Sequence, residues 1–104
     1  MADGRVGEER CDALIIGAGH NGLVCAAYLA GAGLKVTVLE RRAVVGGAAV
    51  TEEFHPGFRN SVAAYTVSLL HPAIIRDLDL AAHGLRIVER RCANFPPPPT
   101  GVTC

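Results

Sequence analysis

A glycine-rich hexapeptide carries the strongest chemical signal in the sequence. It consists of Gly17, Ala18, Gly19, His20, Asn21 and Gly22. In such a G-x-G-x-x-G pattern the first glycine permits a tight turn, the second leaves room for a diphosphate, and the third lets a helix pack closely on a strand. Backbone N–H groups at the start of that helix attract phosphates. The motif predicts a dinucleotide-binding loop, although glycines at this spacing also occur in ordinary structural turns.

An acidic residue stands where such a loop needs a partner for ribose. Glu40 follows a β-branched run downstream of the glycines, and a carboxylate there accepts hydrogen bonds from the two ribose hydroxyls. The same carboxylate would repel a 2′-phosphate, which favours FAD or NAD over NADP. Arg41 and Arg42 follow directly and weaken this argument, because arginine is a common partner of a 2′-phosphate.

Three short elements are expected to hold this loop and this acid in place. Residues 13–16 form an apolar run that suits a buried parallel strand, and residues 35–39 are β-branched and alternating. Between them, residues 21–32 carry helix formers with small residues four apart, and Gly33 supplies a helix end. This order predicts the β-α-β unit of a Rossmann-type FAD/NAD(P)-binding domain, an α/β fold.

Downstream of the second strand the pattern is weaker. Residues 50–54 are expected to be extended and to end at a turn at residues 56–57. Two short helices are expected over residues 63–70 and 73–80, on either side of a His-Pro pair, followed by another strand over residues 85–88.

The sequence divides into three parts. Residues 1–11 form a polar lead, residues 12–91 the N-terminal part of the nucleotide-binding domain, and residues 92–104 a proline-rich, irregular tail. Residues 95–99 contain the tetraproline, which is expected to adopt a polyproline II conformation.

The composition excludes several classes of partner. Ten Lys and Arg balance ten Asp and Glu, so nothing favours a nucleic acid or an anionic membrane surface. The four cysteines lie far apart without ligand spacing, and no metal site is expected. The N-terminal segment lacks the apolar region of a signal peptide, and no apolar run is long enough to cross a bilayer. We therefore expect a cytoplasmic protein without a transmembrane segment, whose partner is a small-molecule dinucleotide.

A second glycine motif narrows the cofactor. Gly46 and Gly47 follow Glu40 at a spacing that resembles the large flavoprotein superfamily of amine oxidases and carotenoid desaturases. The resemblance implies FAD as cofactor, with Glu40 on the adenosine ribose, Arg42 near the adenosine and the glycine pair along the flavin's phosphate side. Ala48 departs from this pattern, since amine oxidases and many desaturases carry arginine there. A phosphate contact of those enzymes is therefore missing.

The longer pattern is similar to the phytoene dehydrogenase-related branch of that superfamily. The similarity rests on the two glycine motifs, on the Gly-His-Asn-Gly variant and on the stretch SLLHPAIIRDLDLAAHGL, and it covers about residues 12–91. It implies a flavin-dependent oxidoreductase of the desaturase type, whose substrates are poorly defined. His20 is either a cofactor contact or an exposed loop residue.

The catalytic residues are unknown from the sequence. In the resembling family, later segments complete the sheet, form the substrate domain and reach the isoalloxazine. The chain is expected to be the N-terminal, ADP-binding portion of such an oxidoreductase, inactive alone. A self-contained NAD- or ADP-binding module and an inert remnant without binding remain open as alternatives.

Overall fold

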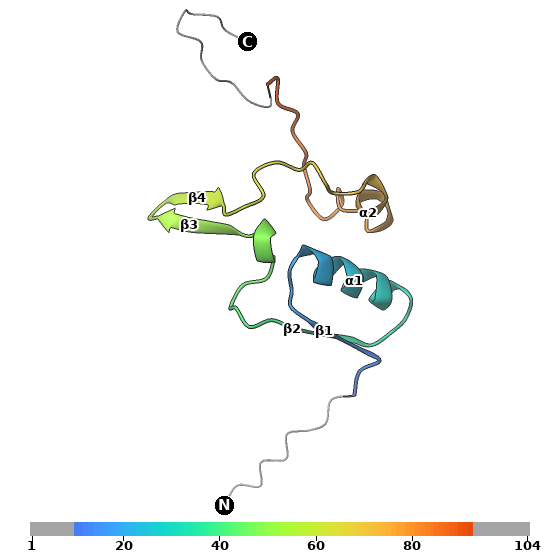
Figure 1. Ribbon diagram of the computed structural model, residues 1–104. Helices are drawn as coiled ribbons and strands as arrows, with labels where there is room; N and C mark the ends of the chain where they lie inside the picture. The colour runs from blue at the N-terminus through green and yellow to red at the C-terminus, as the bar shows by residue number, and fades with distance from the viewer. Residues whose placement is uncertain (1–9, 93–104) are drawn as a thin grey trace, which may run out of the picture.

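The computed structural model describes residues 10–92 and contains a β-α-β unit followed by a hairpin and a short helix (Figure 1). The elements in chain order are β1 (Ala13–Ile16), α1 (His20–Gly31), β2 (Val36–Leu39), the 3₁₀ turn η1 (Gly47–Ala49), β3 (Thr51–His55), β4 (Phe58–Ser61) and α2 (Pro72–Asp77). The polar lead up to residue 9 and the proline-rich segment, with its expected polyproline II conformation, lie outside the described residues.

The predicted β-α-β unit is confirmed, with boundaries shifted by about one residue. Strands β1 and β2 pair in parallel, with Ala13 opposite Val36 and Ile16 opposite Leu39. Helix α1 ends as the sequence predicts, because Gly33 adopts a left-handed backbone with φ of 89° and its N–H reaches the carbonyl of Ala30 at 2.9 Å. Such a glycine end reverses the chain and lets β2 return beside β1.

A β-hairpin follows the second glycine motif. Strands β3 and β4 are antiparallel, and residues 56–57 form the turn between them, as predicted. Gly57 has a φ of 82°, a conformation that glycine adopts at little cost. The Glu53 carboxylate accepts a hydrogen bond from the Gly57 N–H at 2.7 Å, so the strand stabilises its own turn.

Three predicted elements are wrong or shortened. Residues 63–70 form no helix; Ser61 Oγ instead accepts the Ala64 N–H at 3.0 Å, a local bond that competes with helix formation. The helix expected over residues 73–80 is the six-residue α2, after which Asp79 has a φ of 45° and a series of turns begins. Residues 85–88 form no strand, because no described strand lies beside them to complete a ladder.

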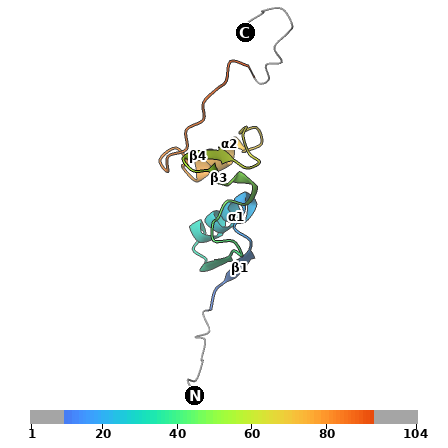
Figure 2. The same ribbon diagram turned by 90° about the vertical axis from the view of Figure 1, so that its left-hand side faces the viewer.

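The elements stack in layers, but they enclose little. In both views α1 lies between the β1–β2 pair and the part of the chain with β3, β4 and α2 (Figures 1 and 2). Among the described residues only Ala18 and Val50 are buried, whereas sixteen large apolar side chains are exposed. Leu14, Ile16 and Leu39 belong to this exposed set and lie on the strand face opposite α1.

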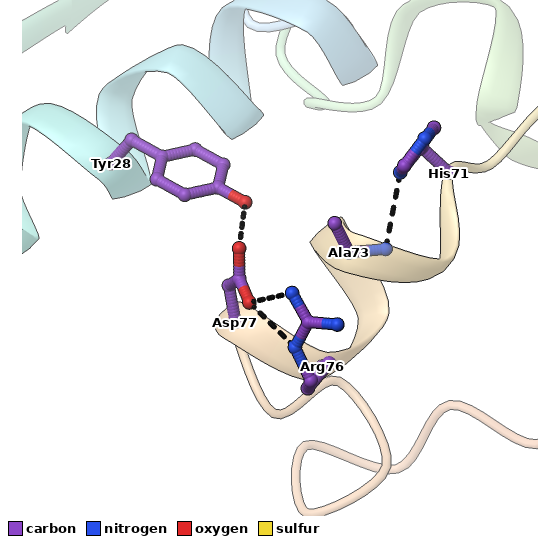
Figure 3. A network of polar contacts seen from close by, with 5 residues as sticks. All are labelled: Tyr28, His71, Ala73, Arg76 and Asp77. Carbon is purple, nitrogen blue, oxygen red and sulfur yellow. Dashed lines mark hydrogen bonds and ion pairs between the residues drawn. The ribbon is translucent and has the colours of Figure 1, made fainter.

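A polar contact joins the two helices (Figure 3). The Tyr28 hydroxyl of α1 donates to Asp77 Oδ2 of α2 at 3.0 Å, and the Arg76 guanidinium holds the other oxygen of the same carboxylate. His71 caps α2, since its Nδ1 accepts the Ala73 N–H at 3.1 Å. Desolvation and the bond to Asp77 raise the pKa of Tyr28, and the bonds from Tyr28 and Arg76 lower the pKa of Asp77.

These pKa shifts predict a pH window for the helix contact. It persists below the ordinary tyrosine pKa and is lost as the pH rises through the raised pKa of Tyr28; on the acid side it is lost as the pH falls through the lowered pKa of Asp77. In a Tyr65→Phe background, which leaves Tyr28 as the single tyrosine, tyrosinate absorbance should titrate at higher pH than after an added Asp77→Asn change. Equal midpoints in the two proteins would contradict the contact.

Candidate dinucleotide-binding site

The predicted glycine loop connects β1 to α1 and turns sharply at its first glycine. Gly17 has a φ of 97°, and its N–H donates to the carbonyl of Leu39 at 2.7 Å, which continues the pairing of the two strands. Gly22 lies against the strand exit. A Cβ atom there would be 2.3 Å from the Gly17 carbonyl oxygen and 3.3 Å from Cγ2 of Ile15. Both glycines are therefore required by the geometry of the turn and of the helix seat.

The first turn of α1 is open to an anion. Gly19 is the N-terminal cap, no side chain caps the turn, and the turn contains no acidic residue. The first helical bond is that of Leu23, whose N–H donates to the carbonyl of Gly19 at 2.9 Å. The preceding amides of residues 20–22 belong to the set that a helix leaves without partners, at the positive end of its dipole. This arrangement suits a phosphate group.

The two glycine motifs touch each other. The Gly46 N–H donates to the carbonyl of Ala18 at 2.8 Å, and Gly19 and Gly46 form a parallel bridge. A Cβ atom at Gly47, which has a φ of 56°, would be 2.9 Å from the Gly19 Cα. The backbones approach this closely only because side chains are absent on both sides. Segments far apart in the sequence thus build one loop system beside the start of α1.

Glu40 is oriented toward this loop by backbone donors. Its Oε2 accepts the Ala18 N–H at 2.7 Å and its Oε1 accepts the Arg42 N–H at 2.9 Å. These bonds, first that of Arg42 and then that of Ala18, lower the pKa of the Glu40 carboxyl group. The Arg41 N–H also contributes to this lowering, and an ionised carboxylate has about four acceptor positions, so acceptor capacity remains. The carboxylate can therefore still accept a hydrogen bond from a ribose hydroxyl group.

The two arginines beside Glu40 differ in their contacts. The Arg42 guanidinium forms an ion pair with the Glu52 carboxylate of β3. Arg41 is exposed and has no ion-pair partner among residues 10–92. Sequence reasoning missed Glu52, because an ion pair between a strand end and a later hairpin leaves no local spacing signal.

A cavity of about 530 Å³ adjoins the loop system. It is lined by His20, Ala48, Ala49 and residues 63–70. The sequence predicts a helix for residues 63–70, which instead line the cavity as an irregular segment. The lining is mainly apolar, with Tyr65, Thr66 and Ser68 as hydroxyl-bearing side chains. The structure thus places His20 at a cavity edge and brings Ala48 to the same edge.

Comparison with known proteins agrees with this geometry. Residues 15–87 match the sequence profile of a family described as NAD(P)-binding Rossmann-like domain. The chain is 55% identical over 96 residues to mouse pyridine nucleotide-disulfide oxidoreductase domain-containing protein 2, and 57% identical over 86 residues to the rat protein of that name. It is also 54% identical over 77 residues to a limonene dehydrogenase subunit of Castellaniella defragrans. No solved structure matches the chain.

These alignments cover most of the chain but little of each relative. They include 92% of the chain for the mouse protein, 83% for the rat protein and 73% for the bacterial protein. The matched segments are only 16%, 15% and 14% of the respective relatives. Within the described part of the chain, no helix is both long and apolar enough to cross a membrane.

Proposed function

Because the chain belongs to the NAD(P)-binding Rossmann-like domain family, we propose that its glycine loop and Glu40 bind the ADP half of FAD. The loop residues 17–22 take the diphosphate through the open amides of α1, and Glu40 takes the adenosine ribose. Arg41 and Arg42 border the adenosine, and Gly46, Gly47 and Ala48 border the phosphates on the other side.

The orientation of Glu40 is the observation that carries this proposal. Its carboxylate is held by two backbone N–H groups, one of them within the glycine loop. The acid therefore contacts the glycine loop itself, and those bonds lower its pKa, which favours the ionised form. A solvated residue at a strand end would need neither contact.

FAD is favoured over NAD by the second glycine motif. Gly46 and Gly47 lie directly against the phosphate loop without side chains in between, so a cofactor that follows this loop would also border the second motif. The neighbouring apolar cavity lies at the His20 end of the loop, whereas Glu40 contacts the loop at Ala18. If the adenosine ribose of a dinucleotide binds at Glu40, the half of the dinucleotide beyond the diphosphate extends toward this cavity.

The activity of a longer protein follows from the cofactor. When bound, FAD would supply a ring able to accept a hydride equivalent from a substrate C–H bond. The residues of this chain hold the diphosphate and the ribose and thereby orient that ring. We propose that the chain is the nucleotide-binding portion of a flavin-dependent oxidoreductase of the phytoene desaturase type. Relatives named as an oxidoreductase and as a limonene dehydrogenase subunit support this class.

Nucleotide titration of the Glu40→Gln variant tests the ribose contact. The amide cannot supply the same charged acceptors, so the affinity for ADP should fall by about tenfold. Affinity for pyrophosphate, which has no ribose, should change little. Amide chemical shifts of the labelled chain at increasing ligand concentration give both affinities.

A matched control variant and the two ligands distinguish a failure of nucleotide binding from a failure of the role assigned to Glu40. Glu89→Gln removes the same charge from an exposed residue outside the site and should leave both affinities unchanged. If the unaltered chain shows no response to ADP, nucleotide binding itself is rejected. If Glu40→Gln binds ADP normally, Glu40 is not the ribose ligand. Tighter binding of NAD than of FAD would favour the self-contained NAD module.

A further inference from the structure

Arg42 lies between two carboxylates, and this arrangement bears on which adenine nucleotides the site accepts. Its backbone N–H donates to Glu40 Oε1 at 2.9 Å, so the backbone of Arg42 lies directly beside the proposed ribose ligand. Its guanidinium turns away to the Glu52 carboxylate on β3. About half of each side chain is exposed, at 45% for Arg42 and 42% for Glu52.

A 2′-phosphate on the ribose needs a cation at this position. In dinucleotide-binding folds, an arginine next to the ribose-binding acid accommodates that phosphate, and guanidinium binds phosphate through paired, charge-assisted hydrogen bonds. Arg42 has the right type and sequence position for this role. One guanidinium nitrogen of Arg42 contacts Glu52 Oε1, and Glu52 adds a second negative charge near a 2′-phosphate that would already face the carboxylate of Glu40.

The hairpin fixes Glu52 in this position. Glu52 pairs with Asn60 in the β3–β4 ladder, and the neighbouring Glu53 is engaged with the Gly57 N–H at the hairpin turn. Adjacent residues of a strand point to opposite faces, so Glu53 cannot take over the contact with Arg42. Only one of the two consecutive acids is able to hold the arginine.

We propose that Glu52 is a specificity-determining residue that withholds Arg42 from a 2′-phosphate and restricts the site to unphosphorylated adenosine ribose. This proposal rests on the proposed function, because it assumes that Glu40 binds the ribose. It assigns to the hairpin a part in nucleotide selection, although none of its residues needs to touch the ribose.

Two probes that differ only in the 2′-phosphate test the proposal. Adenosine 5′-phosphate and adenosine 2′,5′-bisphosphate are titrated against the labelled chain and its variants, with amide chemical shifts as the readout. The unaltered chain should bind adenosine 5′-phosphate, which lacks the 2′-phosphate, more tightly than the bisphosphate. Glu52→Gln should reduce this preference by up to about fivefold, because the half-exposed ion pair then no longer competes with the 2′-phosphate for the Arg42 guanidinium.

Two further variants show whether the released arginine is the cause. Glu53→Gln removes the same charge from the next residue of β3 and should leave the preference unchanged. The double change Arg42→Gln and Glu52→Gln should restore the preference that Glu52→Gln loses.

The outcomes distinguish this proposal from the proposed function. If neither probe binds the unaltered chain, the proposed function fails and this proposal fails with it. If adenosine 5′-phosphate binds and Glu52→Gln leaves the preference for it over the bisphosphate unchanged, only the role of Glu52 is rejected. Equal binding of both probes by the unaltered chain would also overturn it and would point to Arg41 as the phosphate ligand.

Discussion

Replacing Gly22 by alanine should displace α1 from β1 and weaken nucleotide binding. The added methyl group would lie 2.3 Å from the carbonyl oxygen of Gly17, a backbone atom that cannot move without opening the turn. Overpacking of this kind costs on the order of 1–3 kcal/mol. The helix start would shift, and with it the open amides that the phosphate needs.

Gly31 provides a matched control within the same helix. A Cβ atom there meets nothing within 4 Å, so Gly31→Ala should stabilise α1 by about 0.5–1 kcal/mol through its better helix propensity. Helix content is measured by far-ultraviolet circular dichroism, and ADP affinity by titration. Gly22→Ala should lower both, whereas Gly31→Ala should lower neither. Unchanged affinity in Gly22→Ala would reject the assigned role of the third glycine.

The β-α-β unit could be predicted from sequence because its signals are local. Gly17 follows four apolar residues, Gly33 ends a run of helix formers, and β-branched residues follow it. The elements are also short and sequential, so the strands meet through one connection. The stripe of small residues has a more limited role than its spacing suggests, since Gly22 meets β1 while Ala30 at the far end of the helix is exposed.

The region after the hairpin could not be predicted in this way. Residues 63–70 include helix formers, but Val67 and Thr66 are β-branched and Ser61 binds a backbone amide of this segment. The segment lines the cavity instead, a position set by tertiary contacts. An apolar run such as residues 85–88 becomes a strand only beside a partner strand, which sequence periodicity alone does not supply.

In the candidate site, too, the local motifs could be predicted from the sequence and the contacts between separate segments could not. Its glycines and Glu40 could be proposed from the sequence because, in dinucleotide-binding folds, the spacing of such residues follows from the shape of the cofactor and from one β-α-β connection. The contact of Gly47 with Gly19 and the pairing of Arg42 with Glu52 join separate segments of the chain. Such contacts depend on how the hairpin lies against the loop, which the motif does not encode.

The 104-residue chain on its own should show no cooperative thermal unfolding and should retain no stoichiometric flavin. Cooperative unfolding requires a core whose burial offsets chain entropy of about 1–2 kcal/mol per residue. In the described residues this core amounts to Ala18 and Val50. The strand face with Leu14, Ile16 and Leu39 and the open edges of β1 and β2 contribute nothing to it.

Thermal melting with and without FAD tests whether unfolding is cooperative, and the visible flavin spectrum tests whether the chain retains flavin. Saturating ADP should still shift the loop amides, because a ligand increases the population of the binding-competent form by mass action. As a control, the chain replaces the matching segment of the mouse relative, and we expect the rest of that protein to cover the exposed strand face. A cooperative transition should then appear. If the isolated chain instead melts cooperatively, is stabilised by FAD and carries about one flavin per chain, its few buried side chains suffice and it is a self-contained module.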